Sequence, residues 1–428
     1  MRINLLLTGD ELMSGDTVDS NSAMIARQLV PLGWRIQQKL TVGDDLPRLI
    51  TAAQQLSRDC DVLIMNGGLG PTVDDLTAEA LARAAGVAIV EHPAALAHLE
   101  SWCGTRGISL NAANRKQALL PAGCELVANP VGSAVGFSLN VNGCLVICTP
   151  GVPRELEAML SASILPALLA KFSSGTHHVN RFALFGIGES GLQQQITDAI
   201  PDWPASVILG FRAGFPLLEL KLSTTATAAE ALLEPLLARL QPLIANYVIG
   251  EVPLGSTGLS LPEELIKLLV ARKQRVAVAE SCTGGLIASQ LTGIAGSSQV
   301  FEGGFVTYSN AMKQAALGVN AQTLETHGSV SEEVVREMAA GALRVSGADF
   351  TAAVSGVAGP GGGTVDKPVG TVWIAWGSAQ KIHTIKLLVP LGRIMFQQYV
   401  TAVALDLIRR ELLGITTAPT YFRERRPR

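Results

Sequence analysis

Short apolar runs that end in turns rich in Gly and polar residues recur along this chain and limit the folds it can adopt. The runs lie at Ile3–Thr8, Val62–Met65, Arg275–Ala279 and Phe350–Val354. Each has the length of a buried strand, and segments with helical periodicity lie between them. Strands that alternate with helices build parallel sheets that helices cover on both faces. We therefore predict an α/β fold whose polar loops gather at the carboxyl ends of the strands.

The 428 residues are too many for one ordinary core and predict two or three domains. The α/β rhythm of residues 1–172 changes at 178–250, which predicts a small α+β module of about 70 residues. A segment rich in Pro, Gly, Ser and Thr at Pro253–Thr257 predicts a linker, and residues 259–415 form a third, α/β unit. The elements expected in the middle module include strands Val179–Phe185 and Pro216–Thr224 and helices Gly186–Ile200 and Ala228–Ala245.

The composition argues against nucleic-acid and membrane binding. A net charge of −3 and 5% aromatic residues leave no dense Lys/Arg face and few stacking surfaces. The basic stretch Arg423–Arg428 is typical of a solvated chain end. No stretch reaches about 18 consecutive apolar residues, and the first apolar run is shorter than a signal sequence. The six cysteines lack metal-ligand spacing, so we expect a reduced, cytoplasmic protein.

The turn Glu280–Gly285 is the most informative local feature. It follows the strand expected at Arg275–Ala279 and precedes a helix that begins at Leu286. Ser281 would therefore lie at the carboxyl end of a strand and beside a helix N-terminus, where amides and the helix dipole stabilise an oxyanion or a phosphate. The alternative is that Ser281 only caps the helix, which is the commonest role of a serine there.

A lysine further along the chain could activate this serine. Tyr308, Asn310 and Lys313 come together at one strand-to-helix junction. A serine hydroxyl is a poor nucleophile until a base removes its proton, and a partly desolvated lysine with a lowered pKa can be that base. Tyr308 would relay the proton or hold the lysine. The alternatives are a solvated helix residue for Lys313 and a half-buried strand residue for Tyr308.

Repeated glycines follow the strand expected at Phe350–Val354. The stretch Gly356–Gly363 matches neither a Walker loop nor the dinucleotide fingerprint. Glycines nevertheless let backbone amides approach an anion closely, so this loop could hold part of a ligand. A flexible turn before the next strand is the alternative.

Carboxylates beside Gly-rich turns mark the first unit. Asp10 follows the first strand, Asp45 lies in a second loop, and Thr72, Asp74 and Asp75 follow the glycines after Val62–Met65. Hard divalent cations prefer oxygen ligands and are often shared with substrate phosphates, so these loops suit a metal with a phosphorylated substrate. The alternative is that the aspartates serve only as turn and cap residues.

The motifs of the third unit, taken together, resemble the C-terminal domain of the CinA (competence/damage-inducible) family. The resemblance covers, in the family's order, Ala279–Gly285, Tyr308–Lys313, Ser329–Glu332, Ser355–Gly363 and Pro368–Thr371. It implies a nicotinamide-nucleotide amidase, which converts nicotinamide mononucleotide and water into nicotinic acid mononucleotide and ammonia without a cofactor.

The resemblance also implies roles for individual residues. Ser281 is the nucleophile, Lys313 the base, and Tyr308 assists. The residues expected near the oxyanion or the nucleotide are Thr283, Gly284, Asn310, Gly356, Gly359, Gly361 and Arg393. One departure is visible, because the family's late helix opens with Gly-Asp-Arg and carries a second Arg one turn later. Here Gly392-Arg393 lacks the Asp, and Gln397 takes the place of the second Arg.

The first unit is similar to the family's first domain, which is related to molybdopterin-binding folds. The match includes Asn114–Gln117, Asn129–Ala134 and Pro150–Glu155. It implies an ADP-ribose pyrophosphatase that releases AMP and ribose 5-phosphate with a divalent metal (Mg, Mn or Co). The site residues expected are Asp10, Asp45, Thr72, Asp74, Asp75, Arg115 and Lys116, with Asp10, Asp74 and Asp75 as metal ligands. The middle unit resembles the family's KH-type module, with Gly186–Glu189 at the position of its glycine loop.

Several alternatives stay open at this point. The first domain could bind a pterin or nucleotide without chemistry, and the whole chain could be a competence-linked scaffold that partners DNA-recombination proteins. Cys282 lies on the same turn as Ser281 and could compete with it as the nucleophile. The family further implies a homodimer whose ligands are small-molecule nucleotides.

Overall fold

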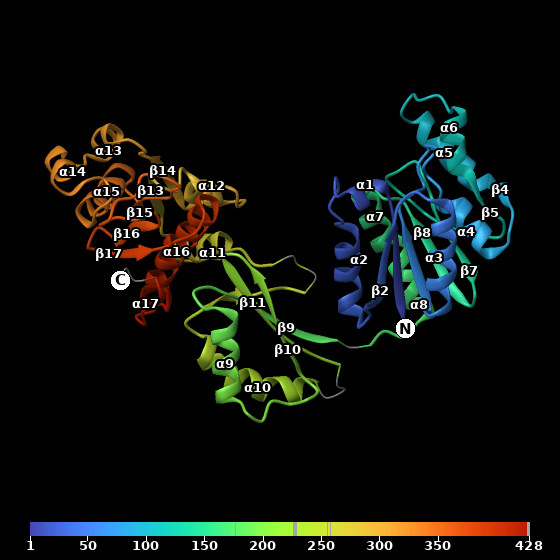
Figure 1. The fold of residues 1–428 in the computed structure, drawn as a ribbon, viewed down its shortest axis with the longest axis horizontal. Coiled ribbons are helices and arrows are strands. Elements are labelled where there is room, and N and C mark those ends of the chain that lie inside the picture. The colour runs from blue at the N-terminus through green and yellow to red at the C-terminus, as the bar shows by residue number, and fades with distance from the viewer. Residues whose placement is uncertain (176, 226–228, 255, 257, 426–428) are drawn as a thin grey trace. The chain divides into compact units, whose positions relative to one another are not determined.

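The computed structural model describes residues 1–425 apart from 176, 226–228, 255 and 257. These residues form two compact units, Met1–His178 and Val179–Arg428, which are taken one at a time below (Figure 1). Among the described helices, none combines the length and the apolar character that crossing a membrane requires.

A six-stranded sheet lies at the centre of the first unit, in the order β2-β1-β3-β8-β7-β6. Its strands are β1 (Ile3–Thr8), β2 (Ile36–Val42), β3 (Val62–Asn66), β6 (Glu125–Val127), β7 (Gly136–Val141) and β8 (Cys144–Thr149). β1, β2, β3 and β8 run parallel, whereas β7 is antiparallel to β8 and β6. The two strands predicted in this unit are confirmed as β1 and β3. Since the parallel strands end at one edge, the loops that follow them gather there.

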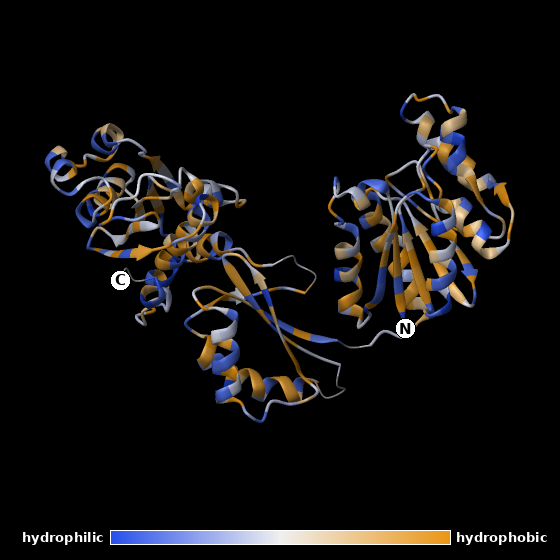
Figure 2. Ribbon diagram, in the orientation of Figure 1, coloured by the Kyte–Doolittle hydropathy of each residue, from blue (hydrophilic) through white to orange (hydrophobic). Residues whose placement is uncertain are grey.

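Helices cover both faces of this sheet (Figure 1). They are α1 (Asp10–Ser14), α2 (Asn21–Leu29), η1 (Val30–Leu32), α3 (Leu46–Arg58), α4 (Thr77–Ala85), α5 (Pro93–Gly104), α6 (Ala112–Arg115), η2 (Lys116–Ala118), α7 (Pro153–Met159), the π-helical turn η3 (Leu160–Ile164) and α8 (Leu165–Lys171). Leu6 packs with residues of α3 and α4, whereas Leu5 and Leu7 pack with residues of α2, α7 and α8. Burial on both faces explains why β1 and β3 are continuous apolar runs (Figure 2).

Two short pairings complete the first unit. The β7–β8 hairpin turns at Asn142 and Gly143, whose positive φ values of 55° and 79° are typical of an Asn-Gly hairpin turn. A two-stranded sheet of β4 (Ile89–Glu91) and β5 (Leu119–Pro121) lies against α4.

The second unit begins with a four-stranded sheet in the order β10-β11-β9-β12. Its elements are β9 (His178–Leu184), α9 (Glu189–Ala199), β10 (Ile208–Gly214), β11 (Leu217–Thr224), α10 (Ala229–Ile244) and β12 (Val248–Glu251). The order β-α-β-β-α-β is that of the ferredoxin-like, split βαβ arrangement, and the KH-type assignment is not confirmed. Ala228, at the start of the predicted helix, lies outside the described residues, as do two residues of the predicted linker Pro253–Thr257.

A five-stranded sheet follows, in the order β14-β13-β15-β16-β17. Its strands are β13 (Val276–Glu280), β14 (Phe301–Val306), β15 (Phe350–Gly356), β16 (Thr371–Ser378) and β17 (Lys381–Leu388). β13 is parallel to both β14 and β15, and β16 is antiparallel to β15 and β17. The predicted strand Arg275–Ala279 is shifted by one residue, so that Glu280 ends it. The carboxyl end of β13 therefore lies between two parallel neighbours.

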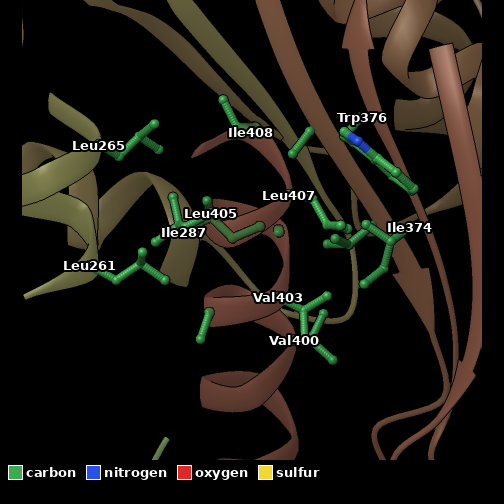
Figure 3. Close-up of a cluster of buried hydrophobic side chains, with 14 of the residues drawn as sticks. Leu261, Leu265, Ile287, Ile374, Trp376, Val400, Val403, Leu405, Leu407 and Ile408 are labelled. Atoms are coloured by element: carbon green, nitrogen blue, oxygen red, sulfur yellow. The ribbon is translucent and has the colours of Figure 1, made fainter. Parts of the chain in front are cut away.

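Two groups of helices sandwich this sheet. The helices are α11 (Leu261–Arg272), α12 (Leu286–Thr292), η4 (Ser297–Gln299), α13 (Asn310–Leu317), α14 (Ala321–His327), α15 (Glu332–Ser346), α16 (Arg393–Leu413) and α17 (Tyr421–Glu424). α11, α12 and α16 pack on the face of Val278, and α13, α14 and α15 pack on the face of Ala279. Figure 3 shows α16 between α11 and β16, with Val400 and Val403 among its buried side chains. α16 therefore lies in the middle of the core, where its buried side chains hold it in place.

The four-stranded sheet and the five-stranded sheet share part of one core. Phe185, directly after β9, packs on Tyr421 of α17 with ring centroids 5.4 Å apart. Two nearly buried guanidinium groups of α16 also reach across, since Arg409 donates to the carbonyl of Val248 at 2.9 Å and Arg410 to that of Asn246 at 2.6 Å. Hydrogen bonds and apolar contacts together join these two sheets.

Candidate functional site

Ser281 follows β13 directly and lies at the carboxyl edge of the five-stranded sheet. Its amide donates to the carbonyl of Val354 on β15 at 3.1 Å, so the strand pairing continues to this residue. The chain then turns into α12 through Gly284 and Gly285, whose φ values of +67° and +99° favour glycine at both positions. The sheet therefore places the serine at the carboxyl end of a strand, as predicted, and the turn leaves it half-buried.

Glu280 holds this turn in place and was missed in the sequence. Its side chain is fully buried, and its carboxylate accepts the Thr283 hydroxyl at 2.6 Å and the amides of Gly285 and Ile287 at 3.0 Å and of Ala288 at 2.8 Å. A carboxylate that ends an apolar strand just before a helix is unusual, because a buried charge needs partners. The position of Glu280 at the end of an apolar strand was therefore the sequence feature that could have identified it.

These contacts change the expected anion site. The Thr283 hydroxyl is committed to Glu280, and three amides at the start of α12 donate to the same carboxylate. The helix N-terminus thus already carries a protein anion, which corrects the expectation that it would face a ligand. In the described part of the chain, the amides of Cys282 and Thr283 donate to no other residue. They are the donors next to Ser281 that remain.

Lys313 meets Ser281 as the sequence predicted. It lies on α13, its side chain is 1% exposed, and its Nζ donates to Ser281 Oγ at 3.1 Å and to the carbonyl of Thr307 at 2.8 Å. Burial lowers the pKa of the Lys313 ammonium, because the charged form loses its hydration. The solvated alternative for Lys313 is therefore wrong, and a lysine amine lies within reach of a serine hydroxyl.

Cys282, the competing nucleophile, is placed differently. Its side chain is buried in the core on the α16 side of the sheet, and burial raises the pKa of the thiol to about 12. A thiol reacts as its thiolate, so this environment makes Cys282 unreactive at neutral pH. The geometry favours Ser281.

Tyr308 does not hold the lysine. Its side chain is 63% exposed, and its hydroxyl accepts a hydrogen bond from Arg393 at 3.1 Å. Arg393 also donates to the carbonyl of Gly359 at 2.7 Å, so it links Tyr308 to the glycine loop. Since the carbonyl of Thr307 holds Lys313, the expected Tyr308–Lys313 contact is replaced by a Tyr308–Arg393 contact.

The other predicted substrate contacts lie around this centre. Asn310 is exposed as the first residue of α13, and Gly361 is exposed in the glycine loop. Gly356 ends β15, where a side chain would collide with the carbonyl of Thr371. Arg393 lies one turn before Gln397 on α16, and the Gln397 side chain contacts the serine turn.

Gln397 contacts the same turn from α16. Its Nε2 donates to the carbonyl of Cys282 at 3.0 Å. The residue was noted in the sequence only as a departure from the family's pattern, and no local signal pointed to this contact across 115 positions.

In the first unit, Asp75 closes the loop after β3. Its carboxylate accepts the amide of Gly70 at 2.7 Å and both the amide and the hydroxyl of Thr72. Asp74 beside it is exposed. Both oxygens of Asp75 are thus engaged by the loop, whereas Asp74 points to solvent.

Asp10 and Asp45 have structural partners at the end of the neighbouring strands. Asp10 and Asp44 exchange hydrogen bonds from amide to carboxylate, each at 3.0 Å. Asp45 caps α3 by accepting the amide of Arg48 at 2.9 Å. For Asp45 the alternative of a cap residue is therefore confirmed.

The two predicted phosphate ligands lie in different settings. Arg115 is exposed and paired with Glu91, whereas the ammonium of Lys116 reaches the carbonyl of Thr72 in the Gly-rich loop. Lys116 also lines a cavity of about 340 Å³, together with Gly68, Asp75, Leu119 and Leu120. The cavity adjoins the carboxyl end of β3, where ligands of open α/β sheets bind.

The three expected metal ligands do not form a protein-only metal site. Within the described ranges, no group of three or more His, Cys, Asp or Glu side chains is arranged to hold a metal ion. Asp75 is engaged by its own loop, and Asp10 pairs with Asp44. What fits this donor set is a cation held by one carboxylate and by the phosphates of a substrate.

Comparison with known proteins finds two family models that match separate parts of the chain. Residues 259–412 match the model of the CinA C-terminal domain, and residues 4–170 match that of a probable molybdopterin binding domain. A CinA-like protein of Colwellia psychrerythraea is 51% identical over 99% of this chain and 98% of its own length. One from Shewanella sediminis is 40% identical over 98% of each chain. The crystal structure of the competence/damage inducible protein CihA from Agrobacterium tumefaciens is 41% identical over 36% of this chain and 97% of its own, with a TM-score of 0.34.

Full-length similarity, two matching domain models and the serine–lysine geometry lead to one assignment. The chain is an α/β protein that belongs to the CinA family, with a molybdopterin-binding-like N-terminal domain and a CinA C-terminal domain.

Proposed function

We propose that the C-terminal domain is a serine amidase that hydrolyses the carboxamide of nicotinamide mononucleotide. The observation that carries the proposal is the buried Lys313 amine, 3.1 Å from the hydroxyl of Ser281. Burial favours the neutral amine, and only a neutral amine can accept the serine proton. A helix cap would need no such partner.

Acylation follows from this pair. Neutral Lys313 takes the proton as Ser281 Oγ bonds to the carboxamide carbon, and the carbonyl π electrons move to its oxygen. The C–N bond then breaks as Lys313 passes the proton to the departing nitrogen. Ammonia leaves, and the nicotinoyl group stays on Ser281 as an ester.

Deacylation reverses the roles. A water molecule attacks the ester carbon and gives a proton to Lys313, and the C–Oγ bond breaks as that proton returns to Ser281. The products are nicotinic acid mononucleotide and the free serine. The carbonyl of Thr307 accepts a hydrogen bond from the amine at 2.8 Å, which holds Nζ of Lys313 beside the hydroxyl of Ser281.

The remaining backbone donors suit the intermediate. The amides of Cys282 and Thr283 come directly after the nucleophile, as oxyanion donors do in other serine hydrolases. Arg393 brings a positive charge near this turn, and with the loop at Gly356–Gly363 it suits the phosphate of a mononucleotide. The identity of the substrate rests on the family resemblance.

The test is ammonia release from nicotinamide mononucleotide by the full chain. We expect Ser281→Ala to abolish it, while the exposed Ser289→Ala stays at the wild-type rate. Cys282→Ala keeps the backbone amide and should remain within about fivefold of wild type. Full activity of Ser281→Ala, or no release by the wild type, would contradict the proposal.

We propose a second activity for the first domain, the metal-dependent hydrolysis of ADP-ribose to AMP and ribose 5-phosphate. The cavity beside Lys116 and the Gly-rich loop supports it, because a lysine and backbone amides suit a pyrophosphate. The exposed Asp74 would hold a divalent cation together with the phosphates, and that cation would neutralise their charge.

This second proposal is tested by measuring AMP formation from ADP-ribose with Mg²⁺, Mn²⁺ or Co²⁺. Asp74→Ala should lower the rate at least tenfold without loss of stability, because the side chain is exposed. Asp59→Ala is the matched control, since Asp59 is an equally exposed aspartate that precedes β3 instead of following it. A domain that binds the nucleotide without forming AMP would indicate the non-catalytic alternative.

A further inference from the structure

The peptide group between Cys282 and Thr283 is held from outside its own turn. Its carbonyl accepts the side-chain amide of Gln397 at 3.0 Å. Gln397 lies between Phe396 and Val400, whose side chains are fully buried in the core. Because these neighbours on α16 are buried, the Gln397 side chain is held in place, and it contacts the turn that carries Ser281.

Planarity converts this contact into a constraint on an amide proton. In a trans peptide the C=O and the following N–H point in opposite directions. When Gln397 fixes the Cys282 carbonyl, it also fixes the direction of the Thr283 N–H, which then points away from α16. That amide donates to no other residue in the described part of the chain.

The preceding peptide is fixed in the same manner by the turn itself. The carbonyl of Ser281 accepts the amide of Gly284 at 3.2 Å, which sets the direction of the Cys282 N–H. Two consecutive carbonyls are thus occupied, and among the described residues no other residue accepts the two amide protons opposite them. The direction of the Cys282 N–H is set within the turn, and that of the Thr283 N–H is set by Gln397, 115 positions away in the sequence.

We propose that Gln397 is a positioning residue for the oxyanion hole of the amidase, acting through the Cys282–Thr283 peptide. The inference rests on the proposed amidase function. Gln397 does not touch the substrate carbonyl in this scheme. It holds a backbone donor in the direction that the developing negative charge requires. Without Gln397 the peptide could rotate, and Ser281 would keep Lys313 but lose one donor for the intermediate.

The experiment compares three variants of the full chain by steady-state ammonia release from nicotinamide mononucleotide. Gln397→Met keeps the length and loses the N–H donor, and Gln397→Glu keeps the shape and replaces the donor with an acceptor. Gln398→Met is the matched control, because Gln398 is a half-buried neighbour with no side-chain hydrogen bond among the described residues. Loss of one oxyanion donor typically lowers kcat by about 10²–10³-fold.

We expect both Gln397 variants to lower kcat at least tenfold while KM changes less than about threefold, with Gln398→Met at the wild-type values. A merely structural role would lower Tm or raise KM instead, so Tm is measured for each variant. If Gln397→Met keeps kcat within twofold of an active wild type, the inference is wrong and the amidase proposal stands. If wild type itself releases no ammonia, the amidase proposal falls and takes this inference with it.

Discussion

Lys313 and Ser281 are 32 residues apart in sequence, yet their Nζ and Oγ atoms lie 3.1 Å apart, because β13 and β14 pair side by side and each leads to one of the two residues. The sheet therefore sets the distance. α13 begins just after β14, and its first turn brings the lysine back over the carboxyl end of β13.

The pH dependence of the proposed amidase activity should follow the protonation of Lys313. Burial lowers the pKa of Lys313 from the ordinary value of 10.5, and the base is active only when neutral. We expect kcat/KM to rise with pH along a limb whose midpoint lies below 10.5. A pH–rate profile with such a limb, absent in the residual activity of Lys313→Arg, is the measurement. A flat profile between pH 6 and 10 would argue against lysine as the base.

The same burial of Lys313 should lower the free energy of unfolding at neutral pH. Its pKa is lower in the folded than in the unfolded chain, so the unfolded state binds more protons between the two values, and stability rises with pH through that window. Lys313→Met should therefore be inactive but at least as stable as wild type at pH 7. Melting curves at pH 7 and 10 should show its advantage shrinking at the higher pH. A clear loss of Tm at pH 7 would contradict this account.

Replacing Tyr308 separates substrate binding from chemistry. Its hydroxyl contacts Arg393 and not Lys313, so Tyr308→Phe should leave the base intact. We expect KM for nicotinamide mononucleotide to rise about threefold to tenfold, in keeping with about 1 kcal/mol for one hydrogen bond, while kcat stays within about threefold. A large fall in kcat with unchanged KM would restore Tyr308 as a proton relay.

Glu280→Gln tests the carboxylate under the serine turn. The amide would present an N–H group to backbone amides that now donate to an oxygen. We expect a loss of about 1.5–3 kcal/mol in the free energy of unfolding, the range for a hydrogen bond to a charged group. Chemical denaturation measures it, with Glu325→Gln at an exposed position of α14 as control, since the described residues give the Glu325 side chain no hydrogen bond or ion pair. Equal stability of both variants would mean that the turn holds without the charge.

Removal of metal should separate the two activities. A chelator such as EDTA is expected to stop AMP formation from ADP-ribose, because the phosphates need a cation, and to leave ammonia release unchanged. Both products can be followed in one sample. Loss of ammonia release after chelation would show that the serine–lysine site also depends on a metal.

The sequence predicted β1, β3, β13 and β15 of the two larger sheets, because burial on both faces leaves continuous apolar runs such as β1 and β15. It also predicted Ser281 and Lys313 together, because Ser281 directly follows a strand and Lys313 belongs to a strand-to-helix junction whose lysine could serve as its base. Local patterns cannot report contacts between distant elements. Gln397 was therefore visible only as a substitution, and Tyr308 was paired with the wrong cation.

The role of a buried charged residue was also missed in the sequence. Glu280 was read as part of a turn, although it ends β13 and takes hydrogen bonds from four donors. In the first domain, Asp45 was expected in a binding site, and the structure shows that its carboxylate caps α3. In the sequence, a loop carboxylate that binds a ligand looks the same as one that binds the backbone. Only its hydrogen-bond partners in the structure distinguish the two.

The shared core of the four-stranded and five-stranded sheets bears on how this protein can be dissected. A fragment that starts at residue 259 matches the CinA C-terminal domain and looks like a natural expression unit. Such a fragment would retain Arg409 and Arg410 while discarding the carbonyls of Val248 and Asn246, and it would uncover Tyr421 where Phe185 now packs. A recombinant fragment that contains the CinA C-terminal domain should begin at β9 instead, so that these guanidinium groups keep their acceptors.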